Sequence, residues 1–369
     1  MLSYHIISTV SRVFLGLVLL FSLTACDSIN NLFSGEGNGE QVETKDLSFA
    51  VAPRVGWMPW FLANEDGVFN KYQSQYGINI EFVADDYLNT ISRFANQEVD
   101  AVAITNIDAI VQLVRQDIEA DVIMIMGYSN GNQAVVVPGD EEANVVGKNF
   151  ALTKYSSLHY LLDRFLIRNQ IDFQQVSLLD LAATDIAEAF NSQQAYGAAV
   201  GNPNLVKLLR KNDGKVLFST SDTPNEIMDL LVVRREVLLD HPNFANALLD
   251  AWFSVMKKLQ GGRKGSTVNA MAELAQLSSD EFNEELNGFV LNDTPEKALS
   301  AIRADHVMRK SMRHIGYFVK RYGLENKTLV SESGNILFNE WVSYPGREEK
   351  LLHYNAKYLQ KYASARLIY

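Results

Sequence analysis

The stretch LSFAVAPRVGWMPWFLANEDGVF, at residues 47–69, contains in order the pattern of a strand, a loop and a helix. The residues at 47–52 are mostly apolar and are followed by Pro53, which is typical of a buried strand. Pro59 then begins a segment with apolar residues near helical spacing, and proline is favoured in the first turn of a helix. A buried strand followed directly by a helix is the repeating unit of α/β proteins.

The same alternation continues along most of the chain. Apolar stretches predict further strands at residues 78–83, 100–105, 121–126, 149–153, 176–181, 196–200, 215–220 and 228–233. Segments with helical spacing separate them, so we expect parallel βαβ units in open sheets. The strand at 228–233 is expected to return to the first sheet, which makes two lobes joined by two crossing segments. We place these crossings at 132–147 and 219–228, and such a hinged pair of lobes closes around a ligand.

This interpretation divides the chain into five parts. Residues 1–25 form a signal peptide, 26–46 a tether, 47–135 with 225–334 lobe 1, 136–224 lobe 2, and 335–369 a C-terminal extension. The extension is rich in Tyr and Lys, and its pattern assigns it no role.

The first residues have the pattern of an export signal. The apolar run VFLGLVLLFSL, at 13–23, is about half of the ~20 residues that a membrane span needs. It leads to Leu23-Thr24-Ala25-Cys26, which resembles the lipobox of bacterial lipoproteins and contains the chain's only cysteine. The resemblance implies cleavage before Cys26 and lipidation of its sulfur; an incidental cysteine is the alternative. The polar segment 26–46 then reads as a flexible tether that holds an exported protein at a membrane surface.

Composition excludes several classes of function. The chain has 369 residues, with 33 Lys and Arg against 44 Asp and Glu, and its net charge of −11 is unlike that of a general nucleic-acid binder. A single cysteine excludes an internal disulfide framework, a Cys-based zinc site and an iron–sulfur cluster. No G-x-S-x-G, HExxH or P-loop motif is present, and no close pair among the six histidines has metal-ligand spacing. We therefore predict neither catalytic residues nor a metal or cofactor.

Candidate ligand-binding residues follow the strands of lobe 1, because open α/β sheets bind ligands at the carboxyl ends of their strands. They are Trp57, Trp60, Asp86, Tyr87, Asn106 and Asp108. The tryptophans can stack on a planar or cationic ligand, with Trp57 favoured over Trp60, and core packing is the alternative. Asp86 lies at a turn, where solvation or helix capping is the alternative. Asp108 lies in a first helical turn, where the helix dipole favours a carboxylate without any ligand.

Four further candidates belong to lobe 2 or to the returning strand. Ser156 and His159 begin a helix, where capping and a structural histidine are the respective alternatives. Asn202 ends a strand in a Gly-Asn-Pro turn. Asp229 lies among apolar residues in MDLLVV, where a carboxylate is unfavourable unless it is paired with a ligand or with a partner in the protein.

Several of these stretches resemble a known family. Gly56-Trp57, Phe61-Leu62-Ala63 and Gly67-Val68-Phe69 resemble the opening of ABC-importer solute-binding proteins of the nitrate/sulfonate/taurine group. Four other stretches resemble a narrower subgroup, which is associated with urea-carboxylase-type nitrogen metabolism. They are Val99-Asp100-Ala101-Val102, Thr105-Asn106-Ile107-Asp108-Ala109, Tyr128-Ser129-Asn130-Gly131-Asn132 and Asn202-Pro203-Asn204. The resemblance covers residues 47 to about 320.

The resemblance implies a type II periplasmic-binding-protein fold, a two-lobe clamshell with two crossover strands. It implies delivery of a small solute to a membrane permease without any chemistry on the solute, and we expect a monomer. The family's ligand loops correspond to Trp57, Asp86, Tyr87, Asn106, Asp108, Ser156, Asn202 and Asp229. Where the family has a tryptophan before the Asn-Pro turn, this chain has Val200-Gly201, which leaves the assignments in lobe 2 open.

The charges near the expected site bear on the solute. Arg54 and Lys154 are the only cations there, against Asp86, Asp108 and Asp229. Aromatic rings with carboxylates favour a small neutral or cationic nitrogen compound, such as a guanidinium-, amide- or urea-like solute. A sulfonate, nitrate-like or carboxylate solute stays open as the alternative. So does a different role, in which a ligand-sensing lipoprotein reports to a membrane receptor.

Overall fold

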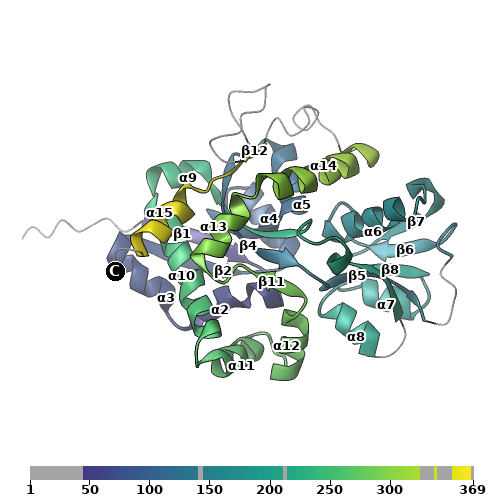
Figure 1. Ribbon diagram of the computed structural model, residues 1–369, viewed down its shortest axis with the longest axis horizontal. Helices are drawn as coiled ribbons and strands as arrows, with labels where there is room; N and C mark the ends of the chain where they lie inside the picture. Colours follow the sequence, from purple (N-terminus) through teal and green to yellow (C-terminus); the bar gives the residue numbers. More distant parts are fainter. Residues whose placement is uncertain (1–44, 140–143, 211–213, 325–335, 339–350, 367–369) are drawn as a thin grey trace, which may run out of the picture. The chain divides into compact units, whose positions relative to one another are not determined.

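Two mixed β-sheets with flanking helices form the protein (Figure 1). The computed structural model describes residues 45–139, 144–210, 214–324, 336–338 and 351–366. We call the first sheet with its helices lobe 1 and the second sheet with its helices lobe 2. The α/β class predicted from the sequence is confirmed.

The sheet of lobe 1 is built from strands that are far apart in the chain. It contains β1 (Lys45–Val51), β2 (Ile78–Ala84), β3 (Ala101–Thr105), β4 (Ala120–Ser129), β10 (Met228–Arg234), β11 (Phe289–Leu291), β12 (Ile336–Phe338) and β13 (Leu352–Tyr354). Their order is β12-β13-β4-β10-β3-β1-β2, with β11 paired to the end of β4. β1 lies parallel to β2 and β3, whereas β10 returns antiparallel between β3 and β4. The predicted return of this strand is confirmed, but the sheet is mixed and not parallel throughout.

The sheet of lobe 2 is also mixed. It contains β5 (Gln133–Pro138), β6 (Asn149–Leu152), β7 (Ser177–Asp180), β8 (Gly197–Gly201) and β9 (Gly214–Ser219), in the order β7-β6-β8-β5-β9. β6 is parallel to β7 and β8, and β5 is antiparallel to β8 and β9. The predicted crossing at 132–147 was therefore too long, because residues 133–138 already pair within the second sheet.

Helices in lobe 1 come from both halves of the chain. The first half supplies 3-10 helix η1 (Val55–Trp57), α2 (Met58–Glu65), α3 (Val68–Tyr76), α4 (Tyr87–Ala95) and a helical run made of α5 (Asn106–Asp108), the π-helix η2 (Ala109–Leu113) and η3 (Val114–Gln116). The second half supplies α9 (Arg235–Asp240), α10 (Asn243–Gln260), α11 (Lys264–Leu274), α12 (Ser279–Leu286), α13 (Pro295–Ile302), α14 (Asp305–Arg321) and α15 (Lys357–Arg366). Lobe 2 has α6 (Ser157–Arg168), η4 (Phe173–Gln175), α7 (Ile186–Asn191), α8 (Asn204–Arg210) and, at its exit, η5 (Thr220–Asp222).

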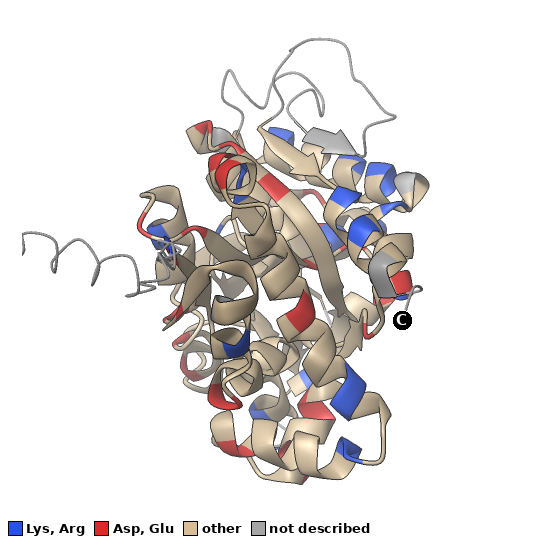
Figure 2. Cartoon of the chain, turned by 90° about the vertical axis from the view of Figure 1, so that its left-hand side faces the viewer, with Lys and Arg blue, Asp and Glu red and all other residues tan. Residues whose placement is uncertain are grey.

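Helix starts agree with the capping signals of the sequence. Ser278 and Glu281 form a capping box at the start of α12, and the side chain of each accepts from the backbone N–H of the other. At α13 the cap is Thr294, and Pro295 occupies the first turn. Most charged residues lie on helices and loops, and the strands are largely apolar (Figure 2).

The C-terminal segment, which the sequence left unassigned, joins lobe 1. β13 pairs in parallel with the first residues of β4, and its Leu352 and Tyr354 are buried in the core. α15 packs against α10 and α13. The carboxylate of Asp121 in β4 contacts three side chains from other segments: Arg235, Asn355 and His353. Among the described residues, no helix combines the length and apolar character needed to cross a membrane.

Candidate functional site

The loop after β1 brings a cation and an aromatic ring together. Arg54 begins η1, and its guanidinium carbon lies 4.9 Å from the centre of the Trp57 ring. The same carbon lies 4.8 Å from the ring of Tyr87, the first residue of α4. The two rings meet edge to face at 5.5 Å. Arg54 therefore lies against both rings, and its Nη1 is buried without a hydrogen-bond partner.

Asp108 lies beside these rings and has partners within the protein. Its Oδ2 accepts hydrogen bonds from the hydroxyls of Tyr87 and Thr105, both at 2.7 Å. Thr105 ends β3 and also caps the helical run that follows, so the strand end fixes the position of the carboxylate. Burial raises the pKa of Asp108, while the two hydroxyls and Arg54 oppose that rise.

Asp229 is the second carboxylate of the cluster. It lies at the start of β10, in register with Thr105 of β3 and Gly127 of β4. Its Oδ2 is buried without a hydrogen-bond partner, and so is the indole N–H of Trp57. Burial raises the pKa of Asp229 to about 6, although Arg54 and the Trp57 N–H partly oppose the rise. The Trp57 N–H acts on the Asp229 carboxylate, but Trp57 Nε1 and Asp229 Oδ2 do not meet in hydrogen-bond geometry.

We call Arg54, Trp57, Tyr87, Asp108 and Asp229 the Arg54 cluster. Sequence analysis selected four of its members, and the structure brings these four together around the fifth. Arg54 was noted only as a nearby cation. Its position in the same loop as Trp57 was the available signal, but the sequence did not show that its side chain would turn back onto the rings.

A second set of unpartnered polar atoms follows the crossing from β4 to β5. Gln133 is 1% exposed, and neither its amide oxygen nor its amide nitrogen has a partner. Its side chain passes Gly201 of β8, and the next residue, Asn202, has a buried Oδ1 that also lacks a partner. The Ser129 hydroxyl, at the end of β4, is unpartnered too. Sequence analysis selected Asn202 but missed Gln133, because a glutamine before an apolar strand carries no distinctive pattern.

Two predicted residues belong instead to the framework of lobe 1. Trp60 is fully buried against Phe49 and Trp252, and its N–H reaches the Met126 sulfur at 3.1 Å. Both amide atoms of Asn106 are hydrogen-bonded within the protein. The nitrogen donates to the Glu226 carbonyl and the Ser311 hydroxyl, and the oxygen accepts from the Met228 N–H. The polar atoms of both side chains have partners within the protein, which favours the structural alternative for each, and their ligand contact stays a prediction.

Three other predicted residues have local structural contacts. Ser156 caps α6 by accepting from the Leu158 N–H and donating to the Thr153 carbonyl. The His159 ring packs between Tyr322 and Phe318, its Nδ1 accepts from the Tyr155 N–H, and burial lowers its pKa to about 3. Asp86 is exposed at the start of α4, while its neighbour Asp85 bonds Asn89 and Arg93. Asp86 directly precedes Tyr87 of the Arg54 cluster in the chain, and no side-chain hydrogen bond joins any of the three to the cluster among the described residues.

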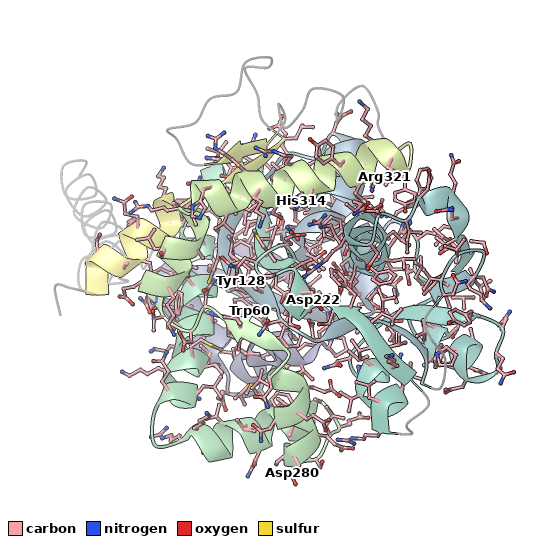
Figure 3. The ribbon with its side chains drawn as sticks, turned by 45° about the vertical axis from the view of Figure 1, so that its right-hand side comes forward. Trp60, Tyr128, Asp222, Asp280, His314 and Arg321 are labelled. Carbon is pink, nitrogen blue, oxygen red and sulfur yellow. The ribbon has the colours of Figure 1, made fainter. Side chains whose placement is uncertain are left out.

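Glu226, in the crossing from β9 to β10, connects the two lobes. Its carboxylate accepts from Tyr160 and Arg164 of α6, each at 2.8 Å, and lies 3.0 Å from His314 of α14. Burial alone would raise the pKa of Glu226, but Arg164 and Tyr160 outweigh it and lower the pKa. Further along α14, Arg321 pairs with Asp163 of α6. The labelled His314 and Arg321 lie along this helix in Figure 3.

Within the part of the chain that the structure describes, no three His, Cys, Asp or Glu side chains are placed to hold a metal ion. The predicted lipidation site, Cys26, lies outside the described residues.

The sequence matches the model of the NMT1-like family over residues 40–276, which is more than half of the chain. The chain belongs to the NMT1-like family. The match extends from β1 to the end of α11, so it includes the Arg54 cluster and Gln133 but not the C-terminal elements. No curated protein matches the chain in sequence.

Solved structures resemble this NMT1-like protein in fold. The periplasmic aliphatic sulphonate-binding protein SsuA of Escherichia coli aligns with a TM-score of 0.63 and 15% identity, over 77% of this chain and 94% of that chain. The nitrate-binding protein NrtA of Synechocystis PCC 6803 aligns with a TM-score of 0.60 and 12% identity, over 88% and 89%. The alkanesulfonate-binding protein SsuA of Xanthomonas axonopodis pv. citri, bound to MOPS, gives a TM-score of 0.62 and 14% identity, over 78% and 97%. These likenesses confirm the periplasmic-binding-protein fold.

Proposed function

We propose that this NMT1-like protein is the solute-binding component of an ABC importer, capturing a small solute and delivering it to a membrane permease without chemical change. The fold and the family support this proposal. Its export and its attachment through a lipidated Cys26 belong to the same proposal, as does a monomeric state. The alternative role, a lipoprotein that reports a ligand to a receptor, uses the same fold and differs only in its membrane partner.

The observation that carries the proposal is two groups of buried polar atoms without partners, one in the Arg54 cluster and one along the crossing from β4 to β5. In the Arg54 cluster these are Arg54 Nη1, Trp57 Nε1 and Asp229 Oδ2. Along the crossing they are Ser129 Oγ, both amide atoms of Gln133 and Asn202 Oδ1. Buried polar groups in proteins are almost always hydrogen-bonded, and each one left unsatisfied costs about 1–3 kcal/mol. A solute that pairs with them removes that penalty.

The chemistry of these atoms favours a neutral nitrogen compound that both donates and accepts. Arg54 and Trp57 offer donors, Asp229 offers an acceptor, and the Gln133 amide offers both. Amide- and urea-like solutes have this combination. Of the predicted solutes we therefore favour the neutral nitrogen compounds over the cationic ones, because the guanidinium of Arg54 already lies against the aromatic rings. The subgroup associated with urea-carboxylase-type nitrogen metabolism remains a prediction consistent with this choice.

A small anion is the second candidate. The free Nη1 of Arg54 can donate a hydrogen bond to one oxygen of a sulfonate or nitrate, and proteins of the same fold are named for binding such anions. Asp108 and Asp229 oppose this choice, since both carboxylates lie within Coulombic range of Arg54.

A binding panel tests the proposal and separates the two solute classes. A soluble form starting at Asp27 keeps all described residues and can be heated with urea, small amides, amino acids, sulfonates, nitrate and guanidinium. A ligand at ~100 times its dissociation constant adds roughly 2.7 kcal/mol to the free energy of unfolding. We expect stabilisation by an amide- or urea-like solute. A flat response to the whole panel would count against the solute-binding role.

The glutamine at the crossing gives a matched test of where the solute binds. Gln133→Met removes the unpartnered amide with little change in volume, and we expect it to weaken the solute at least tenfold in calorimetry. Gln174→Met changes an exposed glutamine of η4 and should leave the dissociation constant unchanged. Equal affinity in the two variants would remove Gln133 from the site.

A further inference from the structure

Arg54 lies against two aromatic rings at the distance of a cation–π contact. A cation is attracted to an aromatic face when it lies within about 6 Å of the ring centre. The guanidinium of Arg54 satisfies this distance for two rings at once, at 4.9 Å from Trp57 and 4.8 Å from Tyr87. The loop holds it there: the Arg54 N–H donates to the Ala52 carbonyl, and the Arg54 carbonyl accepts from the Trp57 N–H, both at 2.8 Å.

The same guanidinium is the positive charge facing two buried carboxylates. Asp108 and Asp229 are 1% and 2% exposed, and Arg54 favours the ionised form of each. It makes no salt bridge with either, since no nitrogen of Arg54 comes within 4 Å of a carboxylate oxygen among the described residues. Without Arg54, the site would present two aromatic faces and two carboxylates, which is the arrangement that binds organic cations.

We propose that Arg54 is the charge-selecting residue of the solute site: its side chain occupies the cation position formed by Trp57 and Tyr87, so that the site rejects cations and offers its free Nη1 to an acceptor atom of the solute. This inference deepens the proposed function and rests on it for the identity of the solute. It adds a testable property of the chain, since exclusion of cations depends on one side chain.

The experiment measures guanidinium binding to the soluble form starting at Asp27 and to its variants. Arg54→Met removes the charge and keeps an unbranched side chain, and Arg54→Gln is a second neutral variant. Guanidinium chloride at low millimolar concentration is the probe, because it has the same head group as the side chain removed. We expect both neutral variants to bind guanidinium at least tenfold more tightly than the unmodified protein, as measured by calorimetry and by the rise in melting temperature.

Two variants serve as controls. Arg54→Lys keeps a cation near the rings and should still exclude guanidinium. Arg168→Met removes another arginine that lies over an aromatic ring, at 5.6 Å from Phe218 in lobe 2, and should leave guanidinium binding as weak as in the unmodified protein. A gain in the Arg168 variant would show that any lost cation–ring contact creates a guanidinium site, and would overturn the assignment.

Other outcomes are equally decisive. Tight guanidinium binding by the unmodified protein, or folded neutral variants without any gain, would overturn the proposal. Neutral variants that do not fold even with guanidinium present would also overturn it, because the cation is expected to refill the vacated position. If the neutral variants gain guanidinium while no solute stabilises the unmodified protein, the charge-selecting role stands and the solute-binding role fails. If a solute binds the unmodified protein but the neutral variants bind guanidinium no more tightly, the solute-binding role stands and the charge-selecting role fails.

Discussion

Glu226 and Asp229 lie three residues apart, where the chain re-enters lobe 1, and both are buried. Glu226 accepts hydrogen bonds from Tyr160 and Arg164 and lies beside His314, and its pKa is lowered. Asp229 has an unpartnered oxygen, and its pKa is raised to about 6. Burial acts on both in the same direction, so the difference comes from the partners.

The comparison separates two uses of a buried carboxylate. Glu226 connects α6, α14 and the crossing, which makes it part of the framework that joins the lobes. Asp229 keeps an acceptor free beside Trp57 and Arg54 at the expense of stability. Unfavourable burial that the protein itself does not relieve is typical of functional sites. The following predictions test this contrast.

The largest effect is expected from Glu226→Ala. It leaves Arg164 and the Tyr160 hydroxyl without their partner, and breaking a buried ion pair in this way costs about 3–5 kcal/mol. Urea unfolding measures the loss. Glu236→Ala, at an exposed position on α9, is the control and should change stability by less than ~0.5 kcal/mol. A similarly small change for Glu226 would contradict its role in joining the lobes.

The pH dependence of stability should show that the pKa of Asp229 is raised, whereas that of Glu226 is lowered. Its folded pKa is about 6 against an ordinary value of 3.8, so the folded state binds more protons than the unfolded state between these values. Its contribution to stability is therefore present at low pH and is lost as the pH rises through 6. The shift corresponds to about 3 kcal/mol at neutral pH.

Asp229→Asn provides the measurement. The variant cannot ionise at this position, so its free energy of unfolding should exceed that of the unmodified protein by up to about 3 kcal/mol at pH 7.5, with the gap closing toward pH 4. The groups that act on Asp229, Arg54 and Trp57, are unchanged in the variant. Parallel pH curves for the two proteins would argue against a raised pKa.

The same variant should bind the solute less well. Replacing the free acceptor of Asp229 by an amide is expected to weaken affinity at least tenfold, or about 1.4 kcal/mol, in calorimetry. Asp121→Asn is the matched control, because Asp121 is buried and both of its oxygens have partners, Arg235 on Oδ1 and Asn355 on Oδ2. Among folded molecules it should bind the solute normally. If Asp121→Asn weakened binding as much as Asp229→Asn, the contrast between paired and unpaired carboxylates would fail.

The smallest effect is expected from Ser156→Ala. Loss of the α6 cap should reduce stability by about 1 kcal/mol. Ser278→Ala, which removes the equivalent cap of α12, should cost a similar amount. Neither variant is expected to alter solute affinity. A tenfold loss of affinity confined to Ser156→Ala would return this residue to the site, as the family resemblance predicted.

Much of the fold could be predicted because it depends on local patterns. The strands at 47–52, 100–105 and 228–233 are apolar runs followed by Pro53, Asn106 and Arg234, and all three form where expected. The strand β13, at 352–354, is too short to carry such a pattern, and its pairing with β4 and β12 makes it a strand. Likewise, Gly127 permits β11 to approach β4, because a Cβ there would lie 2.6 Å from the Val290 carbonyl oxygen.

Site residues were predictable in position but not in role. Trp57 and Trp60 are three residues apart in one stretch, yet one borders Arg54 and the other packs in the core on Phe49 and Trp252. Asn106 and Asp108 begin the same helical run, yet the first holds the crossing and the second faces Tyr87. A helix turns by about 100° per residue, so neighbours point in different directions, and only the packing decides what each meets.

The sequence by itself determined that the chain alternates strands and helices, that a strand at 228–233 returns to the first sheet, and that polar and aromatic residues follow strand ends. These properties depend on periodicity and on turn chemistry, which act over a few residues. Only the tertiary structure decided that Glu226 is paired, that Asp229 is not, and that Arg54 lies against two aromatic rings. Such outcomes depend on atoms brought together from distant parts of the chain, whose distances no local pattern contains.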